Sequence, residues 1–258
     1  MFARHVLASL LLFAACACSS EQPLPAASPS PSPAQPPVPG PAAIRVLMLT
    51  ATAGFRHDSI ATARQVMAEL AAARGEFTVT ATEDLNAINT STLGGYEVLF
   101  FALTSGELAF NGDQKAAIVN FVRSGGGFLG AHSATDTLYE WPDYGAIIGA
   151  YFKEHPWTQQ GTVLIEDQSH PATTGLGDRF SLLEEFYAFR DNPRPRVHVL
   201  LRLDPGSVGG AGDFPLAWTQ SYGEGRVYYN ALGHFAETWR DVRFQQQLAG
   251  AIRWVARR

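Results

Sequence analysis

Short apolar runs alternate with amphipathic segments along most of the chain after residue 43. Residues 44–50 form the first run, and after Ser59 apolar side chains recur at helical spacing up to Gly75. A continuous apolar run is typical of a strand buried on both faces of a parallel sheet, whereas a 3.6-residue repeat indicates an amphipathic helix. The pattern therefore predicts a strand over residues 44–50, followed by a helix that Ser59 caps.

The same alternation continues to the C-terminus, less regularly in the second half. Further strands are expected at residues 77–82, 96–103, 128–131, 162–166, 197–203, 216–221 and 227–230, and further helices at 113–124, 144–152 and 241–256. Residues 222–226 predict a tight turn, so the last two strands should form a hairpin. The alternation predicts one α/β domain with a doubly wound, mostly parallel sheet, helices on both faces, and a C-terminal hairpin and helix.

The N-terminus has a composition unlike the rest of the chain. Arg4 precedes an apolar run, residues 6–15, which is too short to cross a bilayer as a helix and is followed by small residues, as in a secretory signal. Residues 13–20 resemble the lipobox of bacterial lipoproteins, in which either Cys16 or Cys18 would be lipidated. An ordinary cleaved signal with two incidental cysteines is the alternative.

A segment rich in Pro and Ser then separates this leader from the first predicted strand. Such a composition favours an extended, semi-rigid spacer. We therefore expect a lipoprotein signal peptide at residues 1–18, a Pro/Ser-rich linker at 19–43 and a folded domain at 44–258. The protein would be exported and held at the cell envelope by its N-terminal lipid, on the periplasmic side or at the outer membrane.

Charge and cysteine content exclude several classes of function. The formal net charge is −5, with 19 Lys and Arg against 24 Asp and Glu, so the chain lacks the basic surplus that nucleic-acid binding needs. No cysteine follows Cys18. A disulfide scaffold, a Cys-ligated zinc site and a cysteine nucleophile are therefore excluded from the folded part.

Polar side chains gather where four predicted strands end. Ligands of open α/β sheets bind outside the carboxyl ends of the strands, so we expect these residues to line one pocket. Imidazole groups there suit proton transfer or metal ligation. The candidates at these ends are Arg56, His57, Asp58, Ser105, His132, Ser133, Asp136 and His234.

His132 is the strongest of these candidates because glycines precede it in the strand over residues 128–131. The arrangement is similar to a nucleophile elbow, with His in place of Ser or Cys. A buried structural histidine is the alternative, and a structural cap is the alternative for His57. Catalysis by Ser133 would use His132 and Asp136, which lie too close in sequence for the usual arrangement from separate loops.

The remaining histidines and an acidic pair are weaker candidates. His155 and His170 each precede proline and could serve as loop anchors instead, whereas His198 lies within a predicted strand. Glu184 and Glu185 are adjacent, so one carboxylate is expected to enter the pocket and the other to face solvent.

A divalent metal such as zinc is a further hypothesis. Three histidines, or two histidines and a carboxylate, can hold such an ion, and His57, His132 and His234 are the candidate ligands. No local motif such as His-Glu-x-x-His is present, so the site would be assembled from distant loops.

A set of short motifs, in this order along residues 44–258, resembles the ThuA-like (trehalose utilisation) family. The motifs are Gly54-Phe55-Arg56-His57, Gly125-Gly126-Gly127-Phe128-Leu129-Gly130-Ala131-His132, Phe152-Lys153-Glu154-His155-Pro156, Asp167-Gln168-Ser169-His170-Pro171-Ala172, Glu184-Glu185-Phe186-Tyr187, Pro215-Leu216-Ala217-Trp218, Tyr222-Gly223-Glu224-Gly225-Arg226-Val227 and Leu232-Gly233-His234.

The resemblance implies a flavodoxin-like sheet, as in class I glutamine amidotransferases, without their cysteine: Ala131-His132 stands where it is expected. The first member of the acidic pair is often Asp in the family, so Glu184 departs from the pattern and Glu185 carries more weight. The family's link to disaccharide metabolism, beside sugar oxidoreductases, implies a saccharide ligand. Trp218 is a candidate aromatic face for it, with burial in the core as the alternative, and His155 is a further candidate binding residue.

Two hypotheses follow. The first is an envelope-tethered enzyme that acts on a disaccharide or an oxidised glycoside, with His132 as acid or base and His57, Glu185 and His234 orienting or binding. The second is a non-catalytic lipoprotein that binds a saccharide or a partner in the same pocket.

Overall fold

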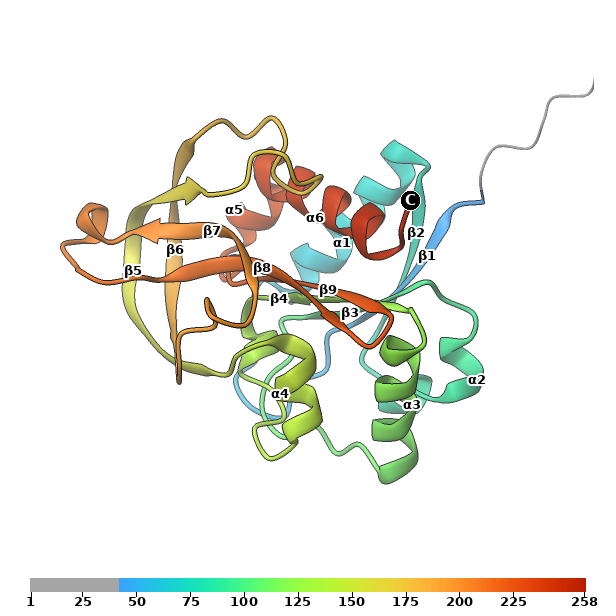
Figure 1. Ribbon diagram of the computed structural model, residues 1–258. Helices are drawn as coiled ribbons and strands as arrows, with labels where there is room; N and C mark the ends of the chain where they lie inside the picture. The colour runs from blue at the N-terminus through green and yellow to red at the C-terminus, as the bar shows by residue number, and fades with distance from the viewer. Residues whose placement is uncertain (1–41) are drawn as a thin grey trace, which may run out of the picture. The chain divides into compact units, whose positions relative to one another are not determined.

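The apolar runs expected as strands lie in one mixed sheet of nine strands (Figure 1). The structure, a computed structural model, describes residues 42–258; the predicted signal peptide, Cys16, Cys18 and all but the end of the predicted linker lie outside the described residues. The strands are β1 (Ile44–Leu49), β2 (Phe77–Thr82), β3 (Val98–Ala102), β4 (Gly127–Ala131), β5 (Phe152–Ile165), β6 (Arg179–Phe189), β7 (His198–Asp204), β8 (Pro215–Tyr222) and β9 (Gly225–Asn230).

The sheet has a parallel and an antiparallel part. Its order is β2-β1-β3-β4-β9-β8-β7-β5-β6, and the first five strands pair in parallel in the order typical of flavodoxin-like sheets. The other four pairings are antiparallel. The α/β class and the β8–β9 hairpin are confirmed, but "mostly parallel" is wrong. The connections between β6, β7 and β8 carry no crossover helix of the kind that parallel neighbours require.

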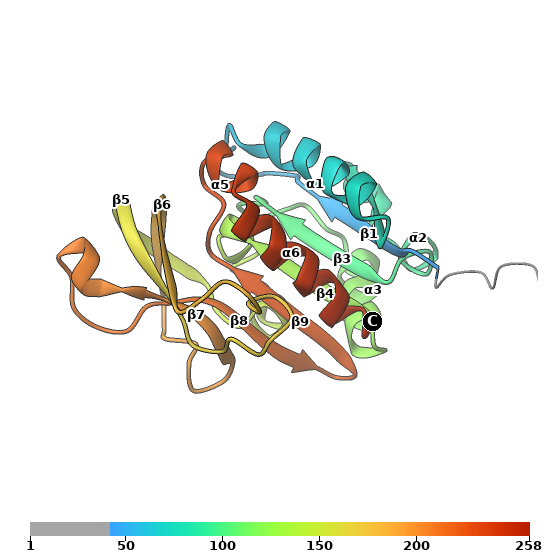
Figure 2. The ribbon, with the colours of Figure 1, turned by 90° about the horizontal axis from the view of Figure 1, so that it is seen from above.

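Helices cover both faces of the parallel part. In Figures 1 and 2, α1 and α6 lie on one face, and α3 and α4 lie on the other. The α-helices are α1 (Ile60–Arg74), α2 (Thr90–Leu93), α3 (Gly112–Arg123), α4 (Pro142–Ile148), α5 (Ala236–Arg240) and α6 (Val242–Val255). Between residues 42 and 258, no helix combines the length and the apolarity needed to cross a membrane.

Several sequence expectations are corrected. The helix expected at residues 144–152 ends at Ile148, because Gly149 adopts a left-handed conformation (φ 96°) and Phe152 begins β5. Helix α1 begins where predicted, but Ser59 does not cap it: its hydroxyl lies 3.4 Å from the Gly233 carbonyl, to which it donates. Strand β5 begins ten residues before the strand expected at residues 162–166, and β6 was not expected at all.

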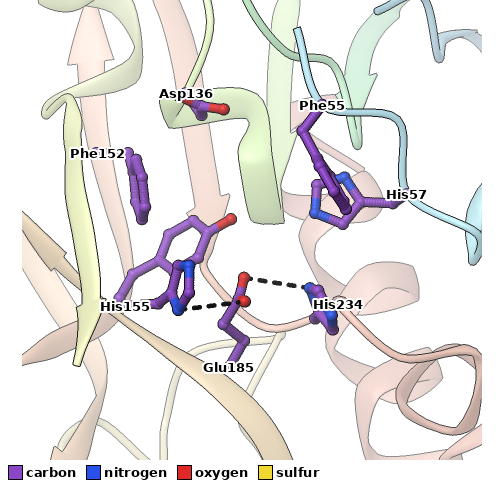
Figure 3. A pocket seen from close by; sticks show the side chains of 8 residues that line it. Phe55, His57, Asp136, Phe152, His155, Glu185 and His234 are labelled. Carbon is purple, nitrogen blue, oxygen red and sulfur yellow. Dashed lines mark ion pairs between the residues drawn. The ribbon is translucent and has the colours of Figure 1, made fainter. Parts of the chain in front are cut away.

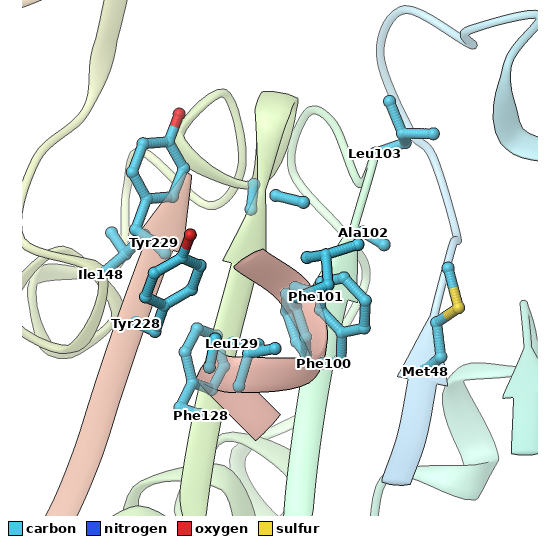
Figure 4. Packing of buried hydrophobic residues seen from close by; sticks show 14 of the residues in the cluster. Met48, Phe100, Phe101, Ala102, Leu103, Phe128, Leu129, Ile148, Tyr228 and Tyr229 are labelled. Atoms are coloured by element: carbon cyan, nitrogen blue, oxygen red, sulfur yellow. The ribbon is translucent and has the colours of Figure 1, made fainter. Parts of the chain in front are cut away.

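The strand that leads to His132 is buried and closely packed. Phe100, Phe101 and Phe128 on β3 and β4 are fully buried (Figure 4). A Cβ atom at Gly130 would come within 2.4 Å of the Ile148 side chain, so only glycine lets α4 pack this closely on β4. Core packing therefore fixes the strand end from which the site projects.

His170 lies outside the site and is buried. Its Nδ1 accepts a hydrogen bond from the backbone N–H of Ala172 (3.1 Å), and its ring packs on Trp254 with centroids 5.0 Å apart. Burial lowers the pKa of His170 to about 4. The neutral ring is therefore part of the folded structure, as expected of a loop anchor.

This shift predicts a pH dependence of stability. Between about pH 6.5, the ordinary histidine pKa, and pH 4, the unfolded chain binds a proton that folded His170 does not, so the free energy of unfolding falls as the pH falls. H170N keeps an acceptor for the Ala172 N–H. Between pH 7 and pH 5 we expect the wild type to lose up to about 2 kcal/mol more than H170N, measured by urea unfolding. H198N, which changes an exposed histidine, should follow the wild type. Equal losses in H170N and the wild type would contradict the prediction.

Candidate active site

A pocket of about 360 Å³ opens at the carboxyl ends of the parallel strands (Figure 3). Loops after β1, β4 and β9 supply part of its lining, and the β5–β6 ribbon supplies the rest. The lining residues are Phe55, His57, Asp136, Phe152, His155, Glu185, Tyr187 and His234. The structure thus brings residues of three of the four predicted polar clusters to one pocket. The β5–β6 ribbon, which the topology prediction lacked, lines the rest of it.

His132 lies beneath this pocket, at the sharp turn after β4. Its backbone is left-handed (φ 51°), which is unfavourable for a residue other than glycine and typical of side chains held at functional turns. The Nδ1–H donates to the Ala231 carbonyl (2.9 Å), so in the neutral ring Nε2 carries the free lone pair. The side chain is 0% exposed, so His132 can reach a ligand only through the groups in front of it.

Four polar atoms surround His132 Nε2. The hydroxyl oxygen of Tyr187 lies 2.9 Å away, and Nε2 of His57 lies 3.0 Å away. Nδ1 of His234 lies at 3.3 Å and the Glu185 carboxylate at 3.5 Å. Side chains from three other segments of the chain therefore meet at a single nitrogen of His132.

The Glu185 carboxylate carries the negative charge of this cluster. Oε2 lies 3.1 Å from His234 Nδ1, and Oε1 lies 3.3 Å from His155 Nδ1. Burial by itself raises the pKa of Glu185, but the neighbouring His132 and His234 imidazoles outweigh it and hold the pKa below its ordinary value. Burial likewise lowers the pKa of His234, yet its hydrogen bond to Glu185 brings the net pKa above the ordinary value. A His234–Glu185 ion pair is the result.

The pKa of His57 is shifted in the opposite direction to that of His234. Burial, followed by the neighbouring His132 and His234 rings, lowers its pKa to about 3, so the ring is neutral. The edge of the Phe55 ring packs on it, with centroids 4.7 Å apart. Its buried Nδ1 has no hydrogen-bond partner among the described residues.

Glu184 is not solvent-facing, which corrects the expectation for one member of the acidic pair. It is fully buried, and its carboxylate accepts hydrogen bonds from the backbone N–H groups of Gly233 (2.9 Å) and His234 (3.0 Å) and from the Thr238 hydroxyl (2.7 Å). Glu184 thus fixes the loop that carries His234, while Glu185 faces the pocket.

The other predicted residues near the pocket divide by position. His155 and Asp136 line it, and the Asp136 carboxylate accepts a hydrogen bond from Tyr139 (2.6 Å). Burial raises the pKa of Asp136. Ser105 is buried behind the β1 loop and donates to the Phe55 carbonyl (2.5 Å). Ser133 is buried outside the lining.

Asp58 lies beside a second hollow of about 290 Å³, which shares Phe55, His57 and His234 with the first. The two hollows therefore meet along the histidines. A ligand that extends over both would contact His57 and His234 at its middle.

Two predicted binding residues lie elsewhere. Arg56 turns away from the pocket and forms a bidentate pair with Glu83 on the exposed surface (3.0 and 2.9 Å). Trp218 is 0% exposed, and its indole N–H donates to the Ile148 carbonyl (3.0 Å). It is part of the core and offers no free face to a sugar, because a tryptophan on a central strand of a two-sided sheet is covered by helix α4.

The sequence prediction missed three lining residues, Phe55, Phe152 and Tyr187. Tyr187 could have been found, because residues two apart in a strand point to the same face and Glu185 was already a candidate. The two phenylalanines carry no such indication.

The flavodoxin-like order of the parallel strands and the histidine–carboxylate cluster at their ends define an α/β protein whose site is built from imidazoles rather than from a cysteine nucleophile. The chain belongs to the ThuA family, described as trehalose utilisation, which matches residues 45–255. A comparison with curated proteins finds no match.

Solved structures of low identity share the fold. A ThuA-like protein from Bacteroides uniformis ATCC 8492 is 24% identical with a TM-score of 0.70, and the match covers 85% of this chain and 94% of that one. A ThuA-like protein from Parabacteroides merdae ATCC 43184 is 19% identical with a TM-score of 0.69, covering 83% and 90%. A β-galactosidase from Bacillus circulans sp. alkalophilus is 13% identical with a TM-score of 0.54, covering 82% of this chain and 31% of that one.

The role of Glu184 in fixing the loop can be tested by E184Q. The amide would place an N–H group against donors that now face a carboxylate, so we expect the free energy of unfolding to fall by about 2–3 kcal/mol in urea titrations. E154Q is the control, because Glu154 is exposed and its ion pair with Lys153 contributes little. If E184Q is as stable as E154Q, Glu184 does not hold the loop.

Proposed function

We propose that this protein is an enzyme of disaccharide metabolism, and that its substrate is a disaccharide or, better, an oxidised glycoside with a keto group. One observation carries the proposal: charged and neutral imidazoles from distant loops converge with a buried carboxylate on one open pocket. Such clusters of perturbed ionisable groups in a concave site are typical of active sites. Membership of the ThuA family supports the saccharide class.

Proton transfer is the chemistry that this pocket suits best. Glu185 raises the pKa of His234 and so favours its charged form, and a positive charge in the pocket lining can polarise a carbonyl oxygen. Figure 3 shows His155 on the other side of Glu185. Its side chain is 50% exposed, so it can pass a proton between substrate and solvent. A C–H group next to a polarised carbonyl is acidic enough for an imidazole base, and a non-reducing disaccharide that has not been oxidised has no such group.

The shape of the site agrees with a two-ring ligand. The main pocket falls within the usual size range of small-molecule sites, and the second hollow continues it past His57 and His234. Phe55 and Phe152 give the lining apolar faces against which sugar rings can pack. A sugar oxidoreductase would have to supply the keto group, so such an enzyme is the proposed functional neighbour.

H155Q tests the assignment of the proton-transferring residue. Incubation of the domain with disaccharides and their keto forms, followed by product analysis, should show turnover of a keto form. We expect kcat to fall by about 100-fold or more in H155Q, because general acid–base groups contribute this much. H198Q is the matched control: His198 is also exposed and also pairs with a carboxylate, Asp167 (2.9 Å), but lies outside the pocket. Equal rates in both variants would refute this role of His155.

A non-catalytic saccharide-binding protein is the competing function. It would bind the same sugars without any product, and the occupied pocket would be revealed by calorimetry. In that case H155Q would change affinity and no variant would change a rate.

We also propose that the chain is an exported lipoprotein, which the composition of its leader and linker supports. In an expressing bacterium, replacing both Cys16 and Cys18 by Ser should move the protein from the detergent phase to the aqueous phase of a Triton X-114 extraction. Single replacements would identify the lipidated cysteine. Partition of the wild type into the aqueous phase would contradict the proposal.

A further inference from the structure

We infer that His57, His132, Glu185 and His234 form the ligand set of a divalent transition-metal site, with Zn²⁺ or a similar ion. Each side chain offers one nitrogen or oxygen atom, and these four atoms all lie within 4.8 Å of one another. Three of the side chains are buried and the fourth is half-buried. The inference goes beyond the proposed function and can hold whether or not a sugar is the substrate.

The separations of the donor atoms have the size of a coordination shell. For metal–ligand bonds of about 2.0–2.1 Å, neighbouring ligands of a tetrahedral ion lie about 3.3 Å apart. Here His132 Nε2 lies 3.0 Å from His57 Nε2, 3.3 Å from His234 Nδ1 and 3.5 Å from Glu185 Oε2. His234 Nδ1 lies 3.1 Å from the same carboxylate oxygen.

Hydrogen bonds alone leave this arrangement unsatisfied. With Nδ1–H donated to the Ala231 carbonyl, neutral His132 has one lone pair at Nε2, and the Tyr187 hydroxyl is enough to occupy it. His57 Nε2 then faces a nitrogen whose lone pair is already used, and His57 Nδ1 is buried with no hydrogen-bond partner in the part of the chain that the structure describes. One ion accepts the lone pairs of all four groups together.

The chemistry and surroundings of the donors also fit an ion. Three imidazoles and a carboxylate are the ligands that zinc and its neighbours prefer, and thiolates, which would favour copper(I), are absent from the folded part. The Ala231 carbonyl fixes the tautomer of His132, and His155 contacts the second oxygen of Glu185, as partners of metal ligands commonly do. Full burial suits His132 better as a ligand than as an acid or base that meets a substrate directly.

The pocket lies on the open side of this ligand set, since His57, Glu185 and His234 line it. A bound ion would supply there the positive charge that the proposed function assigns to His234. Asp136 and His155 lie in the lining outside the ligand set and remain able to carry protons. Zinc-like ions polarise carbonyl oxygens, so a bound ion would be a stronger electrophile in this pocket than a protonated His234.

Metal analysis of full-length protein, purified without a polyhistidine tag from zinc-supplemented medium, tests the inference. We expect about one equivalent of metal per chain. After removal by a chelator, titration with Co²⁺ should give visible absorption bands characteristic of nitrogen and oxygen ligands in low coordination. H57A and H234A should weaken Zn²⁺ binding by about 100-fold or more, as loss of a ligand should exceed the effect of losing a supporting residue. H198A should bind like the wild type.

Circular dichroism of each variant separates loss of metal from loss of fold, and the Co²⁺ spectrum of the wild type reports the ligands without any substitution. Absence of metal in the purified protein, together with no binding of Zn²⁺ or Co²⁺ on titration, would overturn the inference. So would unchanged Zn²⁺ affinity in folded H57A and H234A. If the protein turns over a keto sugar but binds neither Zn²⁺ nor Co²⁺, the proposed function stands and the metal assignment fails. If it binds stoichiometric metal but turns over no keto sugar, the metal assignment stands and the proposed function fails.

Discussion

The buried carboxylate of Glu185 is the group on which the site depends. A carboxylate taken out of water is stable only when nearby donors or cations compensate for the lost hydration. Here His132, His155 and His234 surround it, each from a different part of the chain. Because Glu185 lies on β6, the far edge strand of the sheet, the antiparallel extension must curve back over the parallel strand ends for this contact to form. The ribbon is therefore part of the site.

The packing of β4 and the loop that bears His234 place a second constraint on the site. His132 lies in a left-handed turn at the end of β4, and the absence of a side chain at Gly130 lets the Ile148 side chain of α4 pack closely on this strand. The loop bearing His234 is fixed independently by Glu184, which accepts three hydrogen bonds from it and its following helix. The two adjacent glutamates thus have different roles: Glu184 fixes the backbone of the loop, and Glu185 contacts the imidazoles of the site. Adjacent residues of a strand face opposite sides, which makes this division natural.

Sequence patterns were enough to predict the parallel part and three of the histidines that meet in the site. Buried strands such as β3 are continuous apolar runs, and the carboxyl ends of parallel strands must lie at one edge of the sheet. The β5–β6 ribbon was not predictable in this way. The first ten residues of β5 are mostly exposed on both faces and so lack alternation, and in β6 two adjacent glutamates are both buried. Trp218 was misplaced because its burial depends on α4, a tertiary contact that no local pattern encodes.

The turn after β4 carries an imidazole, whereas a nucleophile elbow carries a serine or a cysteine at its strained turn. A thiolate there attacks a substrate and forms a covalent bond. An imidazole whose Nδ1–H is bound to a backbone carbonyl has instead a fixed tautomer and one directed lone pair. Full burial keeps that lone pair from direct contact with a ligand in the pocket, and the Tyr187 hydroxyl can donate to it within the cluster. The same backbone feature that exposes a nucleophile in one setting thus serves here to complete a cluster, and the groups that face the pocket are those in front of it.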